Sequence, residues 1–424
     1  MTAMKVFKFG GASVKDTASV KNVAEIIHHH GSPTNLLVVV SAMGKTTNLL
    51  EKIVEAFLEK KDHTELINQF SNYHLDIVNE LFPSPQSIEA QIKTYVEELN
   101  HLLYRWSESD SDMLYDQVVS IGELVSSLIV YTYLHDEKKI PCTWLDARSC
   151  IKTDKTWREG KIDWTKSTQQ VEQHVLPILK KQFIITQGFI GQAYSGETTT
   201  LGREGSDYTA AIFAHILHAD SVTIWKDVPG VLNADPKLVE KTILFDKLSY
   251  AEAAEMTYYG ATVIHPKTIR PLQDKHIPLH VRSFIKPDQP GTIISSVESK
   301  QIIPTIIFKP NQLLISFDVK DLYFIHEDKL GKILYQLASH AIRVNMMQHS
   351  ALSFSVCVDQ SNRIKKCLRI LEDDFIIKFN DNLTLLTIRN YNQELINQLI
   401  PDPKHILLEQ RTRHTIQLLI KKNT

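Results

Sequence analysis

The chain has 424 residues, of which 43% are hydrophobic, and its 47 lysines and arginines nearly balance its 49 aspartates and glutamates, for a formal net charge of −2. Such a length predicts two or three domains, and the small net charge provides no field favouring nucleic acid or an acidic membrane surface. No run approaches the roughly 18 apolar residues of a membrane helix, and the N-terminus lacks the layout of a signal peptide.

The four cysteines form no CxxC pair and no metal-ligand spacing (Cys142, Cys150, Cys357 and Cys367). Free thiols are typical of a reducing compartment, so we expect a cytoplasmic protein. Three histidines at 28–30 end a helical stretch, where the helix dipole favours them. We therefore expect no metal site of the protein's own.

Strand and helix patterns alternate over the first 300 residues. The N-terminal run 5–9 and three further β-branched or apolar runs predict short buried strands. This alternation predicts a mostly parallel sheet with helices on both faces, and a ligand site at the C-terminal ends of its strands. The three further strands are expected at 36–40, 181–190 and 221–230, and the longest helices at 48–60, 64–81, 86–106 and 113–136.

The first strand leads into KFGGASV (8–14). Gly10 and Gly11 free backbone N–H groups to cradle a phosphate, and Lys8 would lie at the end of the strand, aimed at the same phosphate. A tight turn with a solvated lysine is the structural alternative.

The second strand leads into GKTT, which superficially matches a phosphate-binding P-loop. That motif requires a glycine at position 39, where this chain has Val39. We therefore exclude a P-loop here, although the hydroxyls of Ser41, Thr46 and Thr47 could line a substrate pocket.

The helical segment SIGELVSS (120–127) places Glu123 among apolar residues. A carboxylate is costly there unless it is paired, so Glu123 could hold a substrate ammonium group. A structural ion pair or a solvent-facing position is the alternative.

The segment TTTLGREGSDYTAA (198–211) precedes an apolar helix. Gly202 and Gly205 allow close approach of a ligand, Ser206 is a predicted N-cap, and Asp207 follows in the first turn. Exposed N–H groups at the start of a buried helix bind anions, and Arg203 can grip a carboxylate or phosphate. An ordinary capped helix with a surface arginine remains the alternative.

The loop WKDVPGVLNADP (225–236) follows another strand. Its charged residues suit contact with a nucleotide and Mg²⁺, and a polar connecting loop is the alternative. These residues are Lys226, Asp227, Asp235 and, just beyond it, Lys237.

Two prolines and a glycine at 286–292 predict a boundary, and we expect domains at 1–297 and 298–424. Beyond the boundary the pattern becomes β-α-β-β-α-β, which predicts a ferredoxin-like unit, and the tail 391–424 is expected to form a second, shortened one. The predicted elements of the complete unit are a strand at 313–319, a helix at 329–341, paired strands at 343–359, a helix at 361–372 and strands at 375–379 and 382–389.

The motifs KFGGASV, SIGELVSS, TQGFIG, TTTLGREGSDYTAA, WKDVPGVLNADP and GATVIHPKTI occur together and in this order. Jointly they resemble the aspartate kinase (aspartokinase) family over about residues 4–295, and the C-terminal part resembles that family's ACT regulatory region. The resemblance implies the amino acid kinase fold and transfer of the ATP γ-phosphoryl group, with Mg²⁺, to the side-chain carboxylate of L-aspartate.

By motif position the resemblance also implies roles. Lys8 would stabilise the transferring phosphoryl group, and Asp207 would orient the loop and the substrate. Glu123 would bind the substrate's ammonium group and Arg203 its α-carboxylate. Ser41, Thr47, Phe189 and Ser206 would shape the aspartate pocket. Gly10, Gly11, Lys226, Asp227, Asp235 and Lys237 would contact the nucleotide.

The sequence departs from the family pattern at several positions. Ala12 replaces a hydroxyl residue, Glu204 replaces a glycine, and Thr262 replaces a lysine that contacts ATP, a role that Lys267 or Lys226 could partly take over. In the regulatory region Asn345 stands where lysine-sensing members often have aspartate, and His349 and Ser350 fall in the same effector-contacting region.

The resemblance implies a homodimer or higher oligomer and a lysine or threonine effector, without partners among nucleic acids or membranes. No homoserine dehydrogenase segment is expected. Two alternatives remain: a related amino acid kinase acting on glutamate, acetylglutamate or carbamate, and a degenerate kinase kept as an amino-acid sensor. A sensor would bind its ligand without releasing ADP.

Overall fold

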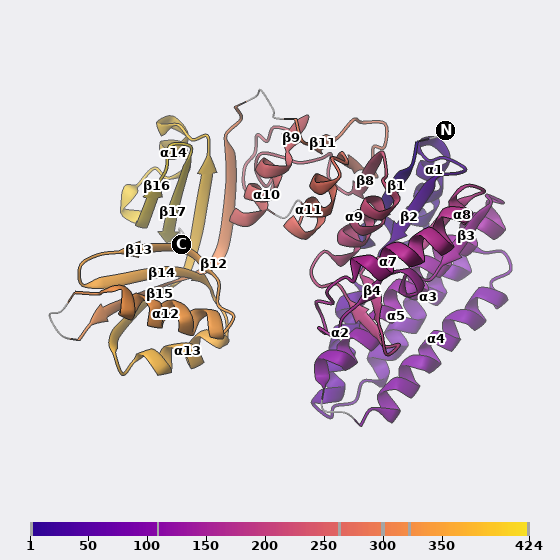
Figure 1. Cartoon of the computed structure of the whole chain (residues 1–424), viewed down its shortest axis with the longest axis horizontal. Helices are drawn as coiled ribbons and strands as arrows, with labels where there is room; N and C mark the ends of the chain where they lie inside the picture. The colour runs from indigo at the N-terminus through magenta and orange to yellow at the C-terminus, as the bar shows by residue number, and fades with distance from the viewer. Residues whose placement is uncertain (1–2, 108–109, 262–263, 298–301, 321–323, 422–424) are drawn as a thin grey trace. The chain divides into compact units, whose positions relative to one another are not determined.

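The computed structural model describes residues 3–107, 110–261, 264–297, 302–320 and 324–421 (Figure 1). Close contacts divide the chain into two compact units. The first consists of Met1–Val231, Leu244–Ala254 and Val263–Ser299, and the second of Leu232–Ile243, Glu255–Thr262 and Lys300–Thr424. Two short segments from the middle of the chain thus belong with the C-terminal unit.

The first unit is built on an eight-stranded sheet in the order β3-β5-β2-β1-β8-β10-β11-β9. Neighbouring strands run parallel except β10 and β11, which form an antiparallel pair. The strands are β1 (Lys5–Phe9), β2 (Leu36–Val40), β3 (Cys142–Leu145), β5 (Phe183–Gln187), β8 (Ser221–Lys226), β9 (Lys247–Ser249), β10 (Leu279–Ser283) and β11 (Thr292–Ser295).

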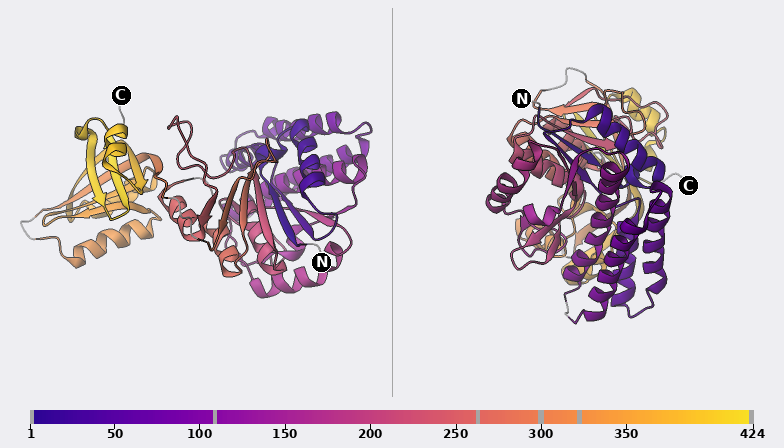
Figure 2. Two further views of the ribbon diagram at one scale, coloured as in Figure 1. Left: turned by 90° about the horizontal axis from the view of Figure 1, so that it is seen from above. Right: turned by 90° about the vertical axis from the view of Figure 1, so that its right-hand side faces the viewer.

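Helices pack on both faces of this sheet, as the alternation predicted (Figure 2). A smaller sheet of β4 (Lys152–Thr153), β6 (Ile190–Ala193) and β7 (Thr198–Thr200) lies in the same unit. The helices are α1 (Thr17–His30), α2 (Thr46–Leu58), α3 (Thr64–Leu81), α4 (Gln86–Arg105), α5 (Ser111–Thr132), α6 (Ala147–Cys150), α7 (Trp164–Gln170), α8 (Leu176–Leu179), α9 (Gly205–Leu217), α10 (Tyr250–Tyr259) and α11 (Pro266–Asp274).

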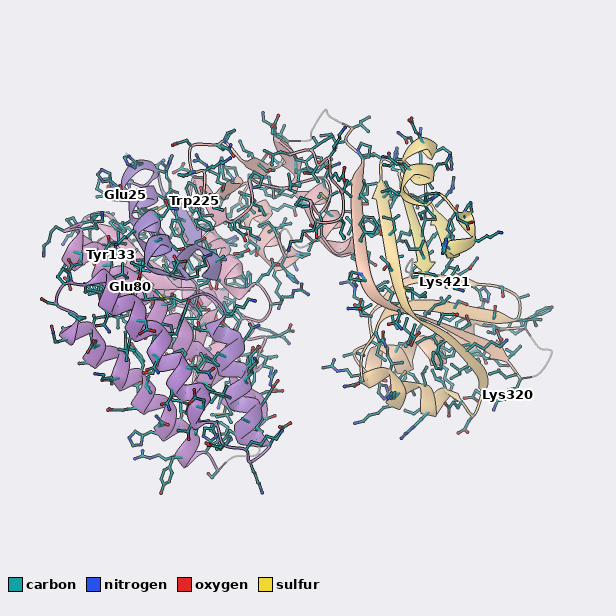
Figure 3. All side chains as sticks on the ribbon, turned by 180° about the vertical axis from the view of Figure 1, so that it is seen from behind. Glu25, Glu80, Tyr133, Trp225, Lys320 and Lys421 are labelled. Carbon is teal, nitrogen blue, oxygen red and sulfur yellow. The ribbon has the colours of Figure 1, made fainter. Side chains whose placement is uncertain are left out.

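Side chains alternate between the two faces along the central strand β1. Phe7 and Phe9 pack into the core formed with α1 to α5. Trp225, labelled in Figure 3, stacks on Phe9 with ring centroids 6.1 Å apart. Lys8 lies between these two phenylalanines in sequence and contacts α9 instead. The pleat of the strand therefore places Lys8 on the face that α9 covers.

The helix α5 and the π-helical turn that follows it are the only span in the described part of the chain long and apolar enough to cross a membrane (Ser111–Glu137). Inside the protein, 83% of the span's most apolar window is buried. Burial of this extent is what a core helix requires, because its apolar surface faces other helices and the sheet.

The division between the units falls close to the expected 297/298, but the segment 286–292 that suggested it is not itself the boundary. Its prolines and glycine form the turn between the antiparallel strands β10 and β11, inside the first unit. Gly291 has φ +71°, and a Cβ there would lie 2.2 Å from the carbonyl oxygen of Val281. The glycine is thus needed where this loop returns close to β10, and sequence patterns do not distinguish such a loop from a linker.

The second unit contains a six-stranded antiparallel sheet in the order β13-β14-β12-β15-β17-β16. Two of its strands are 15 residues long, so the strands predicted at 375–379 and 382–389 are one strand with an irregular register. The elements are β12 (Thr305–Val319), α12 (Glu327–Ser339), β13 (Val344–His349), β14 (Ser353–Asp359), α13 (Arg363–Leu371), β15 (Phe375–Arg389), α14 (Gln393–Leu399), β16 (Ile406–Arg411) and β17 (Thr415–Lys421).

This sheet holds one complete ferredoxin-like motif and a second, partial one with one described helix, α14, and the two share the long strands β12 and β15. The first uses the C-terminal half of β12, then α12, β13, β14, α13 and the start of β15, as the β-α-β-β-α-β pattern predicted. The second uses the end of β15, then α14, β16 and β17. Its remaining strand is Thr305–Lys309, which pairs with Leu385–Arg389. The strand missing from the tail is therefore supplied from before the first motif.

Candidate active site

The predicted motifs meet at the C-terminal ends of the central strands. Lys8 lies near the end of β1, Ser41 directly follows β2, and Lys226 ends β8. Phe189 follows β5 by two residues. Because these strands are parallel neighbours, their ends share one edge of the sheet, the usual ligand site of such folds.

A buried carboxylate lies between two lysines at this edge. Asp207 Oδ1 is 2.5 Å from Lys8 Nζ, and its Oδ2 is 3.7 Å from Lys226 Nζ. Burial alone would raise the pKa of Asp207, but the two lysines hold it below its ordinary value. Asp207 is thus a fixed anion that positions two cations from neighbouring strands.

A second buried carboxyl group, that of Glu123 on α5, lacks such a pairing. Its Oε2 atom is buried without a hydrogen-bond partner. Burial raises the pKa of Glu123 to about 8, against the opposing effects of the Ala42 backbone N–H group and the charge of Lys8. An unsatisfied buried carboxyl group is costly and indicates a partner that arrives with a ligand.

The loops after β1 and β2 pack closely together. The Gly44 N–H group donates to the Gly11 carbonyl at 3.0 Å, and a Cβ at Gly11 would lie 2.7 Å from the Gly44 carbonyl oxygen. Gly11 is therefore required for loop packing, apart from any contact with phosphate. A Cβ at Gly10 would lie 3.3 Å from Lys8 Nζ, so Gly10 leaves room beside this ammonium group.

The hydroxyl residues predicted for the substrate pocket lie on the loop after β2 and on the start of α2. The Ser41 carbonyl accepts a hydrogen bond from the Ser126 hydroxyl on α5 at 2.6 Å. Thr47 is half-buried in the first turn of α2. This bond ties the loop to the same helix that carries Glu123.

The helix α9 begins at Gly205 with Glu204 in the N-cap position, so Ser206 is not the N-cap that the sequence predicted. Ser206 instead lies against the loop after β5, where a Cβ at Gly188 would be 2.4 Å from the Ser206 Cβ. Phe189 has φ +69°, and its N–H group donates to the Thr209 hydroxyl at 2.9 Å. The loop after β5 is thereby fixed to the first turns of α9.

Arg203 is exposed at the tip of the loop before α9. No carboxylate in the described part of the chain lies within ion-pair distance of its guanidinium group, whereas Lys8 and Lys226 both pair with Asp207. This arrangement leaves the group available to an anionic ligand.

The predicted nucleotide loop is divided between the two units. Lys226 and the exposed Asp227 belong to the first unit, and Asp235 and Lys237 belong to the second. Within the second unit, the Lys237 N–H group donates to Asp235 Oδ1 at 2.9 Å. Asp235 therefore has a structural role in its own turn.

The positions that depart from the family pattern have different environments. Ala12 is exposed in a short 3₁₀ turn, and Thr262 lies outside the described residues. The Glu204 Oε2 atom accepts a hydrogen bond from the His265 N–H group at 2.8 Å, so the carboxylate has a partner at the start of α11. Lys267 Nζ lies 3.7 Å from Glu159 Oε1.

Sequence reasoning missed Asp116, a fully buried carboxylate on α5 two turns before Glu123. It accepts hydrogen bonds from the Arg158 N–H group and from the N–H and hydroxyl groups of Thr200, at 2.6–3.1 Å. Burial nevertheless raises its pKa. Asp116 holds β7, which leads into the Arg203 loop, and the signal that singled out Glu123, a charge within an apolar helix, applies equally to it.

Within the described ranges, no group of three His, Cys, Asp or Glu residues is placed to hold a metal ion. The histidines at 28–30 form the last turn of α1, where His30 Nε2 lies 3.4 Å from Asp288 Oδ1.

In the second unit, Asn345 belongs to a polar cluster at the irregular centre of the sheet. Lys309 Nζ donates to Asn345 Oδ1 at 2.9 Å and lies 2.8 Å from Asp359 Oδ1. The Asn345 amide in turn donates to Gln312 Oε1 at 2.8 Å. Asn345 thus contacts an ammonium group of the chain itself.

A parallel sheet with a lysine pair at its strand ends, followed by a ferredoxin-like region, is typical of a phosphoryl-transferring α/β enzyme with a regulatory domain. The amino acid kinase family matches residues 3–283. Lysine-sensitive aspartokinase 3 of Escherichia coli (strain K12) is 34% identical over 362 residues, which cover 85% of this chain and 79% of that protein. Aspartokinase 1, chloroplastic, of Arabidopsis thaliana is 30% identical over 436 residues, covering 97% and 73%.

Among solved structures, E. coli aspartokinase III in complex with aspartate and ADP superposes with a TM-score of 0.84 at 29% identity, covering 99% of this chain and 96% of that one. The chain therefore belongs to the amino acid kinase family and, within it, to the aspartokinases. The predicted fold is confirmed: a catalytic amino acid kinase fold followed by an ACT-type region.

Proposed function

We propose that this protein transfers the γ-phosphoryl group of ATP to the side-chain carboxylate of L-aspartate. The product, 4-phospho-L-aspartate, opens the synthesis of lysine, threonine and methionine. The related E. coli enzyme was solved with aspartate and ADP bound. The observation that carries the proposal is the buried Glu123 carboxyl group, whose Oε2 atom has no hydrogen-bond partner and which feels the charge of Lys8.

Aspartate has one ammonium group and two carboxylates, and the site offers a complement to the ammonium group and to one carboxylate. Glu123 binds the ammonium group, and the exposed Arg203 binds the α-carboxylate, so the side-chain carboxylate stays free to attack. Ser41, Thr47, Phe189 and Ser206 shape the pocket around it.

The phosphoryl group is received on the lysine side of the site. Lys8 and Lys226 neutralise charge on the phosphates, and Asp207 holds both lysines in place. The nucleophile is already ionised at neutral pH, so catalysis needs no general base and rests on positioning and electrostatics. Gly10, Gly11 and Asp227 are the further proposed nucleotide contacts in the first unit.

Magnesium would enter with ATP. Asp207 is engaged by two lysines, and Glu123 lies where burial favours its neutral form. Asp207 is therefore already occupied by cations of the chain, and Glu123 ionises when the ammonium group of the substrate pairs with it, so neither is a proposed metal ligand. Mg²⁺ is therefore held mainly by phosphate oxygens and water, as is common for this ion, and supplies charge neutralisation.

Residues 298–424 form the proposed regulatory domain, in a cytoplasmic homodimer or higher oligomer. Large apolar side chains are exposed in the second unit, as expected of a surface that pairs: Phe324, Tyr335, Met347 and Phe379. The name of the related E. coli enzyme states lysine sensitivity, so lysine or threonine is the proposed effector. Activity assayed in millimolar lysine, threonine and both together tests this, and unchanged activity would count against it.

The test of the activity is ADP release with ATP, Mg²⁺ and L-aspartate, with hydroxylamine present to trap the acyl phosphate. We expect aspartate-dependent ADP release and aspartyl hydroxamate, with L-glutamate giving neither. Aspartate binding without ADP release would instead favour the amino-acid sensor, and turnover of glutamate would favour a related amino acid kinase.

A further inference from the structure

Glu204 adopts a backbone conformation that favours glycine. Its φ is +54°, and Gly202 two residues earlier has φ +76°. Together they form a tight turn, in which the Gly205 N–H group donates to the Gly202 carbonyl at 2.9 Å. A residue with a side chain is strained in this region, so its presence calls for a compensating contact.

The side chain of Glu204 provides such a contact. Its Oε2 atom accepts a hydrogen bond from the His265 N–H group at 2.8 Å, immediately before α11. The His265 Nδ1 atom accepts the next N–H group, that of Lys267, at 3.2 Å. Burial lowers the pKa of the His265 ring, although the charge of Glu204 opposes this effect, and a neutral ring is consistent with its acceptor role. The carboxylate thus completes the capping of α11 from a loop 61 residues away in the sequence.

The backbone of this loop also approaches its neighbours closely at both of its glycines. A Cβ at Gly202 would lie 3.1 Å from the Arg158 carbonyl oxygen, and a Cβ at Gly205 would lie 2.5 Å from Phe189 Cδ2. Arg203, between them, is exposed and has no ion-pair partner among the residues described. Its direction therefore depends on the backbone on either side, and Glu204 is the adjacent residue whose side chain anchors that backbone.

We propose that Glu204 is a positioning residue, which fastens the loop 202–205 to the start of α11 through the His265 N–H group and so presets Arg203 for the substrate carboxylate. The proposal rests on the proposed function in one respect, that Arg203 binds the α-carboxylate of aspartate. It gives a role to a carboxylate that stands where the family usually has glycine.

The neighbourhood contains a second acidic residue that serves as a matched control. Glu159 is exposed and lies 3.7 Å from Lys267 Nζ, so Glu159→Gln removes a negative charge nearby but leaves the His265 contact intact. If the negative charge alone matters, Glu159→Gln and Glu204→Gln should have similar effects. If Glu204 positions the loop, Glu204→Ala should have a larger effect than either glutamine variant.

The experiment measures kcat and both KM values for Glu204→Ala, Glu204→Gly and Glu204→Gln. We expect the alanine and glycine variants to raise the KM for aspartate about tenfold, with kcat and the KM for ATP within about twofold of wild type. Only the fixed orientation of Arg203 toward the substrate carboxylate is lost in these variants. Glutamine keeps an acceptor oxygen and should stay within about threefold. The glycine variant removes the strain as well, so its thermal stability should equal or exceed that of the alanine variant.

An unchanged KM for aspartate in the alanine and glycine variants would overturn the proposal. A fall in the KM for ATP alone would also overturn it, because the carboxylate would then compete with phosphate at the start of α11. Hydrogen exchange of the amides at 202–206 tests the loop contact separately from the proposed activity on aspartate. It should accelerate in Glu204→Ala whether or not aspartate is the substrate, and unchanged exchange would contradict the loop contact itself.

Discussion

The strand-end site of the first unit and the six-stranded sheet of the second differ in how the sequence encodes them. In the first unit, motifs about 200 residues apart assigned Lys8 and Asp207 to the same site, and the two side chains lie 2.5 Å apart. In the second unit the helices and strands were largely predicted, but the strand that completes the second motif was not. That strand, Thr305–Lys309, precedes the first motif in the sequence.

The difference reflects the kind of constraint acting on each region. A site that binds charged ligands requires particular residue types at particular positions, so its motifs can be found in the sequence. Strand pairing is compatible with many apolar sequences, so a sequence does not show which strands pair. A six-stranded sheet can therefore be completed by any edge strand of suitable alternation, and the local pattern does not say which one.

The first prediction concerns the strand-end site of the first unit, where we expect the largest change in activity. Replacing Lys8 by alanine removes the cation closest to Asp207, and we expect kcat to fall by about 10²- to 10³-fold, the usual effect of losing one preorganised electrostatic group. The measurement is hydroxamate formation at saturating ATP and aspartate. Lys21→Ala, an exposed lysine on α1, is the control and should retain wild-type activity. A Lys8→Ala protein that is folded and within tenfold of wild type would contradict the role of this lysine.

A second prediction tests the shared sheet. Ile306 lies in the strand Thr305–Lys309 and is buried against Leu386, Ile388 and Ile416. Ile306→Ala should lower the free energy of unfolding of the second unit by about 2–5 kcal/mol, as is typical when a large core residue is truncated. Ile302→Ala, an exposed position just upstream, is the matched control and should change it little. Equal effects of the two substitutions, followed by denaturant unfolding, would mean that this strand does not complete the sheet.

A smaller, graded effect concerns pH. Because burial raises the pKa of Glu123 to about 8 in the free protein, most of the carboxyl group is protonated at pH 7. A substrate ammonium group favours the ionised form, so binding below pH 8 must release this proton. The KM for aspartate should therefore fall as pH rises from 6 to 8, by up to about tenfold per pH unit, and level off above that range. The same profile in Glu123→Gln would assign the titration to another group.

Sequence predicted the catalytic fold and a ligand site at the C-terminal ends of the parallel strands, because such strands share one edge of the sheet. The family resemblance assigned Lys8 and Asp207 to this site, but their ion pair was not predicted. It could not predict that Glu204 contacts His265, since a flexible side chain at a surface loop has no periodicity to indicate its partner. Nor could it predict that Asp235 and Lys237 belong with the second unit, because that depends on the packing of Ala234 and Val239 against a sheet formed much later in the chain. The substrate and nucleotide roles of individual residues remain predictions.

If Glu123 binds the ammonium group of an amino-bearing dicarboxylate, the site should distinguish L-aspartate from succinate, which lacks that group. A comparison of the two compounds tests this directly. The measurement is the apparent affinity of each, from KM for aspartate and competitive inhibition by succinate, in wild type and Glu123→Gln. We predict that the wild type prefers aspartate by at least about a hundredfold, and that Glu123→Gln reduces this preference to less than about tenfold, because the buried carboxylate is the group that pairs with the ammonium. A wild type that binds the two equally, or a variant that keeps the full preference, would contradict the account.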